Sequence, residues 1–439
     1  MTAPKGSRTL RLGVAGLGTV GGGLLKLIER QEELRLPGRL VVTAVSARSK
    51  TRNRGADISK LRWVDDPVEL ATADDVDVVV ELIGGSDGPA KLTVEAALKA
   101  GKPVVSANKA LIAEHGIEIA ELAEKHHAHL LFEAAVGGAI PIVRAIRNSL
   151  SGVVVSRVAG ILNGTCNYIL SEMLRTGAAY ETVLADAQRL GYAESDPYLD
   201  VSGMDAAHKV LILASIAFGA QPDFAQVNVE GVDQIEAMDI TLANKFDYRI
   251  KLVAEAFRAT NGKDSGGVRC RVAPVLLHKD HPLAQINGPL NAVVVEGEPV
   301  GRLTFTGPGA GAGPTAAAVM GDLARLFEGP AMPPLGKPAK ELASIITSAK
   351  GSADQGSFFI GAKLADKPGV FAALTEELAE AGVSIDKLIQ ESAGDTGAAP
   401  VAIMTHPCPR ASIERALAKV AELKITTDTP RLLRIETRT

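Results

Sequence analysis

The stretch that decides the fold lies near the N-terminus, where Thr9–Gly21 reads TLRLGVAGLGTVG. Residues Thr9–Ala15 have the apolar pattern of a buried strand, and Val20–Gln31 have a helical pattern. The glycines between them suit a tight turn, a close approach of backbone N–H groups to a pyrophosphate, and close packing of helix on strand. Because the turn directly follows the first strand, we interpret it as a dinucleotide-binding loop rather than as a simple turn. Its residues are Gly16, Leu17, Gly18, Thr19, Val20 and Gly21.

Strand and helix patterns alternate through the first third of the chain. We expect strands at Leu40–Ser46, Asp77–Glu81, Pro103–Ser106 and His129–Glu133, and helices at Ala90–Ala100 and Ile117–His126. Apolar strands that alternate with helices are typical of a parallel sheet covered on both faces. The sequence therefore predicts an α/β fold, with a Rossmann-like doubly wound parallel sheet over residues 1–138.

The pattern changes over residues 139–306, which we expect to form an α+β domain. Its helical patterns are Ala179–Leu190 and Met204–Ala220, and its strand-like runs are Val272–Leu277, Ala292–Glu296 and Gly301–Phe305. A glycine-rich turn then opens a helix over about 307–328, expected to complete the first domain. Residues 329–356 have the composition of a linker, with one helix expected around Lys340–Ser348.

The tail, residues 357–439, has the pattern of a separate small domain. Strands are expected at Phe358–Leu364, Val383–Gln390, Val401–His406 and Leu432–Ile435, and helices at Val370–Ala381 and Ser412–Glu422. This βαββαβ order is typical of a ferredoxin-like fold.

Composition narrows the class of protein. With 439 residues, the chain is long enough for two or three domains. The formal net charge of −4 gives no support to a nucleic-acid or anionic-membrane partner. Three widely spaced cysteines indicate neither a disulfide framework nor a thiolate metal site. A polar N-terminus without an apolar signal core makes a cytoplasmic protein the expectation.

The end of the second expected strand bears on cofactor choice. An acidic residue that would bind a ribose hydroxyl is missing after Ala44–Ala47, and Arg48 and Lys50 follow instead. Cations there would hold a 2′-phosphate, so NADP(H) is favoured and NAD(H) is the second option. The alternative is that both are solvated loop charges.

Carboxylates gather in one stretch, Ala187–Lys209, which reads AQRLGYAESDPYLDVSGMDAAHK. It contains Glu194, Asp196, Asp200 and Asp205 ahead of a single lysine, Lys209. A helix that starts near Ser202 or Gly203 would put Asp205 and Lys209 at positions i and i+4 on one face. Taken alone, such a pair is usually an ordinary surface pair.

The stretch resembles the signature of homoserine dehydrogenases. Positions at the family's spacing are Ala187, Gly191, Asp196, Pro197, Asp200, Gly203, Asp205 and Lys209. The resemblance extends over nearly the whole chain, through VVSANKAL at Val104–Leu111, FEAAVGGAIPI at Phe132–Ile142 and GILNGTCNYIL at Gly160–Leu170.

This resemblance implies an NAD(P)H-dependent reduction of L-aspartate 4-semialdehyde to L-homoserine, in threonine and methionine biosynthesis, or the reverse oxidation. Reduction places negative charge on the aldehyde oxygen, which needs a proton donor or a cation. Lys209 and Lys109 can each supply it, and the sequence leaves the choice open. By analogy Asp205 orients Lys209 and the substrate, and Glu194 binds the substrate's amino group.

The resemblance also implies roles for several loops. Asp200, Asn163, Gly164 and Thr165 would line the substrate site of a substrate-binding and dimerisation domain. Ser106, Lys109 and Gly309, the last in the turn at 307–309, would contact the cofactor. A monovalent cation, Na⁺ or K⁺, would be bound by Glu133 and by the backbone of Val136, Gly138 and Ile140.

The tail resembles an ACT domain, through KLADKPGVFAALTEELAEAGVSIDKLIQ at Lys363–Gln390. Such domains commonly bind amino acids near the turn that follows the first strand and pair with one another. The implied effector is L-threonine, and the implied assembly is a homodimer or homotetramer. The alternative is a structural module without a ligand.

Two other functions are considered. Cys166 lies in a glycine-rich loop before a helix, where a thiolate can be activated, as a phosphorylating semialdehyde dehydrogenase would require. A non-catalytic amino-acid sensor is the second alternative, against which the intact signature through Lys209 argues.

Overall fold

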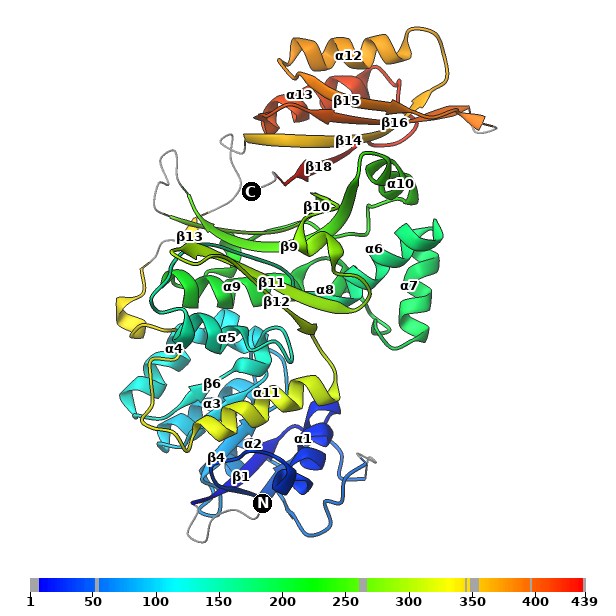
Figure 1. The fold of residues 1–439 in the computed structure, drawn as a ribbon. Coiled ribbons are helices and arrows are strands. Elements are labelled where there is room, and N and C mark those ends of the chain that lie inside the picture. Colours follow the sequence, from blue (N-terminus) through cyan, green and yellow to red (C-terminus); the bar gives the residue numbers. More distant parts are fainter. Residues whose placement is uncertain are drawn as a thin grey trace.

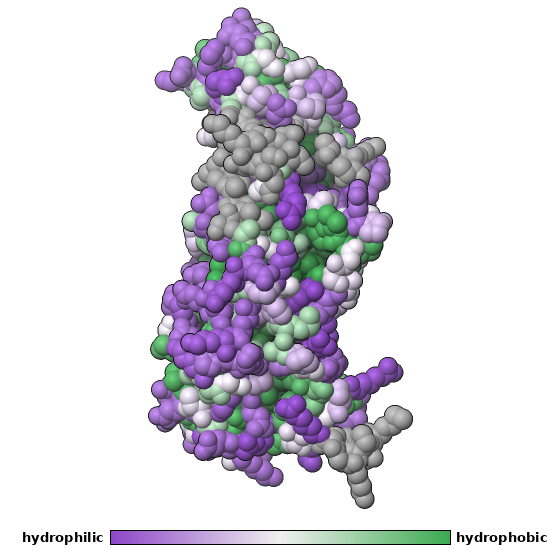
Figure 2. All heavy atoms as spheres, turned by 90° about the vertical axis from the view of Figure 1, so that its left-hand side faces the viewer, coloured by the Kyte–Doolittle hydropathy of each residue, from purple (hydrophilic) through white to green (hydrophobic). Residues whose placement is uncertain are grey.

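The computed structural model describes residues 8–51, 55–259, 267–343, 346–347, 355–394 and 397–436. Three regions follow one another along the long axis of the molecule, with the nucleotide-binding region at the bottom of Figure 1 and the C-terminal region at the top. Between them lies the expected α+β domain of residues 139–306, which contains the acidic stretch Ala187–Lys209 and is called the catalytic region below. Figure 2 shows hydrophobic side chains gathered at mid-height on the right of the view, while hydrophilic and hydrophobic residues are mixed below them.

The nucleotide-binding region is the predicted doubly wound sheet. All its strands are parallel, in the order β3-β2-β1-β4-β5-β6. The order reverses between β1 and β4, which is where doubly wound sheets bind ligands. The strands are β1 (Thr9–Ala15), β2 (Arg39–Ser46), β3 (Arg62–Trp63), β4 (Val78–Glu81), β5 (Val104–Ser106) and β6 (Leu130–Leu131).

Helices cover both faces of this sheet. One face packs on α1 (Thr19–Glu29) and on α11 (Ala312–Arg325), which returns from the catalytic region as predicted. The other face packs on α2 (Pro67–Thr72), α3 (Pro89–Lys99) and α4 (Lys109–Lys125). Helix α4 begins at Lys109 and not at the expected Ile117, because the Asn108 side chain caps it by accepting from the Leu111 N–H.

The catalytic region is built on an antiparallel sheet in the order β12-β11-β7-β9-β10. Its strands are β7 (Val154–Ile161), β9 (Tyr248–Arg258), β10 (Val268–His278), β11 (Leu290–Glu298) and β12 (Gly301–Pro308). The longer helices are α6 (Gly164–Thr176), α7 (Tyr180–Arg189), α9 (Met204–Phe218) and α10 (Ala237–Lys245), and α8 (Tyr198–Val201) is a single turn.

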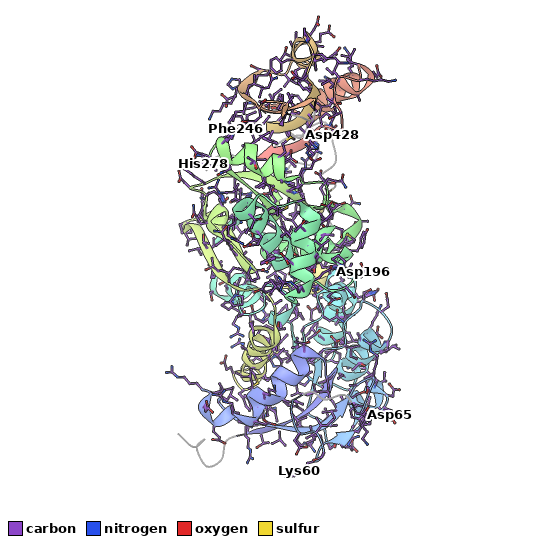
Figure 3. All side chains as sticks on the ribbon, turned by 90° about the vertical axis from the view of Figure 1, so that its right-hand side faces the viewer. Lys60, Asp65, Asp196, Phe246, His278 and Asp428 are labelled. Atoms are coloured by element: carbon purple, nitrogen blue, oxygen red, sulfur yellow. The ribbon has the colours of Figure 1, made fainter. Side chains whose placement is uncertain are left out.

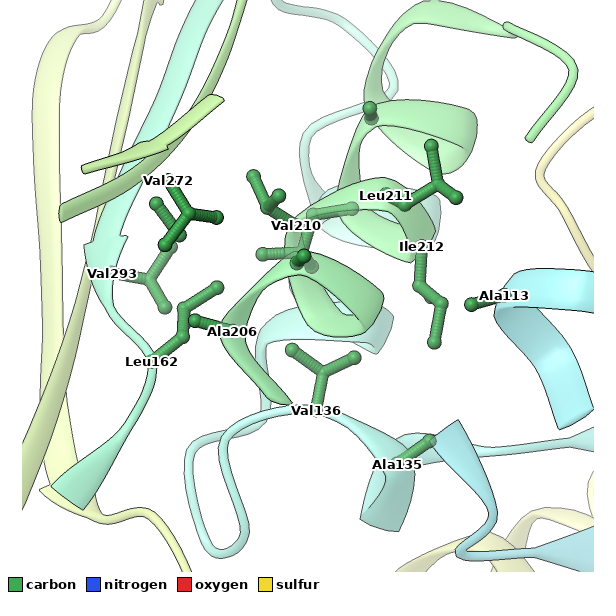
Figure 4. Close-up of a cluster of buried hydrophobic side chains, with 14 of the residues drawn as sticks. Ala113, Ala135, Val136, Leu162, Ala206, Val210, Leu211, Ile212, Val272 and Val293 are labelled. Atoms are coloured by element: carbon green, nitrogen blue, oxygen red, sulfur yellow. The ribbon is translucent and has the colours of Figure 1, made fainter. Parts of the chain in front are cut away.

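Helix α9 lies between this sheet and the nucleotide-binding region. Figure 4 shows Val210 near Val272 of the sheet, and Ile212 on the opposite side near Ala113 of α4. The helix is apolar nearly all round because it is buried on all sides. Asp205 and Lys209, in its first two turns, are therefore held in a rigid core, whereas His208 between them is half-buried and pairs with Glu114.

The C-terminal region has the predicted βαββαβ order and packs α12 (Val370–Glu380) and α13 (Arg410–Glu422) on one face of its sheet. The strand order is β18-β14-β16-β15, from β14 (Gln355–Ala365), β15 (Ile385–Gln390), β16 (Ala398–Thr405) and β18 (Arg431–Ile435). Strand β18 also pairs in parallel with β10, through Val275–Arg434 and Leu276–Ile435. The catalytic and C-terminal sheets are thus continuous.

Buried charges reinforce this junction. Glu436, which follows β18, accepts hydrogen bonds from Arg271 at 2.9 Å and from Arg157 at 3.1 Å. Both arginines also bind Glu255 of β9. Lys363 of β14 crosses the junction and donates to Glu236, the residue before α10, at 2.6 Å. Asp428, labelled in Figure 3, lies within the C-terminal region, 3.0 Å from the same ammonium.

One expectation for the linker was wrong. No helix forms around Lys340–Ser348 in the part that the structure describes, from which 344–345 and 348 are excluded. Ala339–Glu341 form one 3-10 turn, Ala343 bridges to Ala220, and Ile346–Thr347 pair with β10. Pairing with existing strands outweighs the local helical preference.

Candidate active site

One carboxylate joins two ammonium groups at the centre of the molecule. Asp205 lies in the first turn of α9, which begins after Gly203 in a left-handed conformation. One Asp205 oxygen lies 2.7 Å from the Lys209 Nζ, and the other lies 2.7 Å from the Lys109 Nζ. Lys209 also donates to the Leu162 carbonyl at 2.7 Å. The structure thus confirms the i, i+4 pair and brings Lys109 to it from the first turn of α4.

The pair is not a surface pair. The side chains of Asp205 and Lys209 are 8% and 10% exposed, whereas that of Lys109 is 41% exposed. Lys109 stands directly after β5, at the carboxyl edge of the nucleotide-binding sheet. The cluster therefore connects that edge to the core of the catalytic region, with Lys109 as its solvent-facing member.

The charges in the cluster shift one another's protonation. Burial opposes ionisation of Asp205, but the ammonium groups of Lys209 and Lys109 hold the pKa of its carboxyl well below the usual value. The Asp205 charge raises the pKa of Lys109. Burial dominates at Lys209 and lowers its pKa, against the opposing effect of Asp205. Both Asp205 and Lys109 are thus ionised at neutral pH.

The first turn of α6 adds a polar layer to the cluster. The Asn163 amide donates to Asp200 at 2.8 Å and to Asp205 at 2.9 Å. The Thr165 hydroxyl lies 2.7 Å from the Tyr192 carbonyl and 3.2 Å from Asp200. Burial raises the pKa of Asp200. Asn163, Thr165, Asp200 and Asp205, which lie apart in the sequence, thus form one network.

Glu194 lies close to this network on an exposed loop. Its charge helps to raise the pKa of Lys109, after the larger effects of Asp205 and Asp200. Asp196 accepts from the Tyr198 N–H at 3.1 Å, and Figure 3 shows it where the catalytic and nucleotide-binding regions meet. Asp196 therefore shapes the loop that carries Glu194.

The glycine loop fits a dinucleotide. Gly16 has a φ of +106°, and a Cβ there would collide with the Leu82 carbonyl. Gly18 precedes α1 without a side-chain cap, and a Cβ there would meet nothing within 4 Å. The space beside Gly18, at the start of α1, is thus open, as the approach of a pyrophosphate requires. The Leu17 side chain is buried in the core, so only its backbone can contact a cofactor.

The end of β2 carries cations and no acid. Its last residue is Ser46, whose carbonyl accepts from the Gly16 N–H at 2.8 Å. Arg48 and Lys50 follow and are exposed. They lie beside the edge of the glycine loop, where the ribose of a bound dinucleotide is held in this fold.

Sequence reasoning missed two residues that hold Ser106 and Lys109. The Ser106 hydroxyl donates to the fully buried carboxylate of Glu81 at 2.6 Å, and burial raises the pKa of Glu81. Asn108 donates to the Gly85 carbonyl at 2.7 Å and caps α4. Glu81 ends the apolar strand VVVE, and an acidic residue at that place in the sequence could have indicated its role.

The turn before α11 reaches back to the site. A Cβ on Gly138 would lie 2.6 Å from the Gly309 backbone, and the Ala139 N–H donates to the Pro308 carbonyl at 3.1 Å. On its other side Gly309 packs against the Asn291 amide, which is 1% exposed. A side chain at Gly309 would therefore clash with Asn291, a residue that sequence reasoning missed.

The Glu133 carboxylate is occupied by backbone donors. It accepts from the Val143 N–H at 3.0 Å and the Arg144 N–H at 2.9 Å. Burial, followed by the nearby Asp322 charge, raises the pKa of Glu133 to about 7. The expected ligands Val136, Gly138 and Ile140 are buried in the adjacent turn.

Cys166 is unsuited to nucleophilic catalysis. It is fully buried, and its thiol lies 3.2 Å from the Asp200 carbonyl, to which it donates. Burial raises the pKa of the thiol well above its usual value, so no thiolate forms at neutral pH. The acyl-enzyme alternative was therefore wrong, and Cys166 serves in packing.

Comparison with known proteins agrees with this site. The family model for the homoserine dehydrogenase NAD-binding domain matches residues 16–133, that for homoserine dehydrogenase matches 141–324, and that for the ACT domain matches 358–424. The homoserine dehydrogenase of Mycobacterium tuberculosis is 40% identical over 440 residues, covering 99% of each chain.

Solved structures agree as well. The homoserine dehydrogenase from Thiobacillus denitrificans superposes with a TM-score of 0.88 at 36% identity, covering 98% of each chain. A hyperthermophilic archaeal homoserine dehydrogenase in complex with NADPH superposes with a TM-score of 0.62 at 25% identity, covering 73% of this chain and 98% of that one. This chain belongs to the homoserine dehydrogenase family.

Proposed function

We propose that the Lys109–Asp205–Lys209 cluster carries the interconversion of L-aspartate 4-semialdehyde and L-homoserine by this NAD(P)-dependent oxidoreductase. The observation that supports it is the pairing of Asp205 with both lysines at 2.7 Å, at the carboxyl edge of the nucleotide-binding sheet. The nicotinamide, when bound, supplies or accepts the hydride. The chain's own groups must then bind the substrate and move a proton at its oxygen.

We assign the proton transfer to Lys109. Lys209 is buried, and two of its three N–H donors are already directed at Asp205 and Leu162. Lys109 has one such partner and is the more exposed, so its Nζ can reach a substrate oxygen. Asp205 keeps Lys109 protonated in the reductive direction, and Lys209 fixes the position of Asp205.

Substrate contacts follow from the surrounding polar layer. Asp200 and Glu194 carry the negative charge that suits the substrate's cationic amino group. Asn163, Gly164 and Thr165 open α6 and offer hydrogen-bonding groups on the same side. We expect these residues to set the affinity for the amino acid without affecting cofactor affinity.

We propose NADP(H) as the preferred cofactor. Arg48 and Lys50 suit a 2′-phosphate, and β2 ends in Ser46 where NAD-binding loops place an acid. The glycine loop, Ser106, Lys109 and Gly309 would provide the remaining contacts.

For a monovalent cation, we propose Glu133 and the backbone carbonyls of Val136, Gly138 and Ile140 as the oxygen ligands. Each oxygen of the Glu133 carboxylate accepts one N–H group, which leaves further lone pairs for a cation. Dependence of turnover on Na⁺ or K⁺ tests this.

We further propose L-threonine as an effector of the ACT domain, bound near the turn at Asp366–Val370. Deleting the domain would remove β18 from the continuous sheet, so a point variant is the cleaner test. Asp366→Ala should weaken inhibition by L-threonine, measured as the concentration that halves activity. An unchanged value would place the effector elsewhere.

A homodimer or homotetramer is the expected assembly. Exposed apolar residues on the catalytic sheet support it, among them Val154 at 74%. Light scattering after gel filtration measures the assembly directly. We propose a cytoplasmic location. Among the described residues, no helix is long and apolar enough to cross a bilayer.

The deciding experiment is a spectrophotometric assay of L-homoserine oxidation with NADP and with NAD, each with and without L-threonine. We expect turnover with a higher kcat/KM for NADP. Absence of turnover with both cofactors would overturn the proposal.

A further inference from the structure

A buried lysine lies outside the catalytic cluster and has no acidic partner. Lys251 of β9 is 2% exposed, and no ion pair joins it to a carboxylate among the described residues. Its ammonium is surrounded by neutral oxygens. They are the carbonyl of Ile286 at 2.6 Å, the Asn167 amide at 2.9 Å, and the side chains of Ser171 and Asn287, each at 3.3 Å.

A buried ammonium without an acidic partner lowers the stability of the fold. Burial of an ammonium is unfavourable, and burial lowers the pKa of Lys251 to about 7, with a smaller contribution from Arg249. A methionine would fill a similar volume without this cost. The ammonium therefore provides something that packing alone does not, and its four oxygen contacts indicate what that is.

These contacts join α6 to the irregular segment 286–290. Asn167 and Ser171 stand on successive turns of α6, and Ile286 and Asn287 begin the segment. Asn167 also donates to the carbonyls of Ile286, Gly288 and Leu290 at 3.2, 2.9 and 3.1 Å. Lys251 thus lies at the centre of a network that sets the distance between helix and segment.

The network ends at the catalytic cluster. Asn167 stands one turn after Asn163, which donates to both Asp200 and Asp205. A Cβ on Gly164 would lie 2.7 Å from the Pro289 carbonyl, so the start of α6 touches the segment directly. Because a helix is stiff, a shift of its second turn moves the first.

The same segment leads to the turn before α11. Leu290 begins β11, and the next residue, Asn291, packs against Gly309. Lys251 thus lies behind both the substrate-binding turn of α6 and the proposed cofactor contact at Gly309.

We propose that Lys251 is a positioning residue for the reaction, whose buried ammonium fixes the first turn of α6 against segment 286–290 and so aligns Asn163 and Thr165 with Asp200 and Asp205. It acts through Asn167 and touches no reacting group. The inference rests on the substrate-binding roles proposed for Asn163 and Thr165.

The test compares Lys251→Met with Leu252→Ala in the full-length enzyme. Leu252 is the next residue of β9 and is 3% exposed. Side chains alternate along a strand, and Leu252 packs in a different hydrophobic cluster from Val253 on the opposite face. Its truncation should therefore destabilise the same strand while leaving the contacts of the Lys251 ammonium in place. The readouts are kcat and KM for homoserine, the Kd for NADPH by fluorescence titration, and the unfolding midpoint.

We expect Lys251→Met to lower kcat/KM for homoserine by about 10- to 100-fold, the effect of displacing catalytic groups by about 1 Å. The Kd for NADPH should change less, because Lys251 reaches Gly309 only through segment 286–290 and Asn291. Leu252→Ala should lower the unfolding midpoint and leave kcat/KM nearly unchanged. A value of kcat/KM within about threefold of wild type for Lys251→Met, or equal losses in both variants, would overturn the inference.

Two further variants keep the test decisive. Ser171→Ala leaves Lys251 in place, removes one of its oxygen contacts and should lower kcat/KM by a few-fold. It takes the place of Lys251→Met if that variant does not fold. An unchanged kcat/KM in Ser171→Ala would then count against the inference. Asn163→Ala separates the two proposals. If Asn163→Ala keeps full activity, the proposed substrate site is wrong; if it loses activity while Lys251→Met does not, only the positioning role fails.

Discussion

The substitution Asp205→Asn removes the one charge that two lysines share. Each ammonium lies 2.7 Å from a different oxygen of the Asp205 carboxylate, and both the Asp205 and Lys209 side chains are at most 10% exposed. An amide leaves a buried ammonium whose remaining described partner is the Leu162 carbonyl. Breaking a buried ion pair by removing one partner costs about 3–5 kcal/mol. The loss of orientation should lower kcat by about 10²- to 10⁴-fold.

Urea unfolding and steady-state kinetics measure the two effects separately. The matched control is Asp186→Asn, which removes a carboxylate of α7 that pairs with Arg189 in an exposed position. That pair should contribute at most about 1 kcal/mol, and its loss should leave kcat unchanged.

The pKa of Asp205 determines how the stabilising effect of its carboxylate depends on pH. The pKa of Asp205 in the native protein lies below the value of 3.8 for a free carboxyl, so its stabilising effect is full above that value and is lost as the pH falls through the native pKa. The stability difference between wild type and Asp205→Asn should therefore shrink at acid pH. A variant with stability within about 1 kcal/mol of wild type and an undiminished kcat would refute the assigned role.

Three further predictions concern other parts of the chain. Arg48→Ala should raise the KM for NADPH more than that for NADH, and equal changes in steady-state assays would remove the support for NADP preference. Cys166→Ala should keep most of the activity, and iodoacetamide should not inactivate the native wild type; inactivation prevented by substrate would revive a nucleophilic role. Arg157→Met should lower the free energy of unfolding, measured in urea, by about 3 kcal/mol, because it leaves the buried Glu255 carboxylate with one arginine partner. Since the arginines lower the pKa of Glu255 to about 2, from 4.5, that loss should shrink between pH 4.5 and 2, and a pH-independent loss would contradict this reading.

Local patterns predicted the elements well. The strand that ends in a glycine loop, the alternation of strands and helices, and the βαββαβ tail all appear in the structure, because each depends on hydrophobic period and turn chemistry. The i, i+4 spacing also placed Asp205 and Lys209 on one face of α9. The helix expected around Lys340–Ser348 was wrong, because partners distant in sequence decide the conformation of that segment.

Contacts between distant segments could not be predicted in this way. Lys109 and Asp205 meet because α4 and α9 pack together across two regions. Nothing in the spacing near Lys251 indicates that its ammonium joins α6 to segment 286–290. The parallel pairing of β18 with β10, which makes the ACT domain part of the central sheet, is likewise a property of the whole fold.

At the centre of the proposed mechanism, Lys109 transfers the proton at the substrate oxygen, and Lys209 holds Asp205 in place beside it. The most direct test measures kcat for NADP-dependent homoserine oxidation in Lys109→Ala and Lys209→Met, with unfolding curves to verify that both variants fold. The account predicts that kcat falls by about 10²-fold or more in each variant. Near wild-type turnover in folded Lys109→Ala would contradict the assignment of the proton transfer, and near wild-type turnover in folded Lys209→Met would contradict the role of Lys209 in holding Asp205.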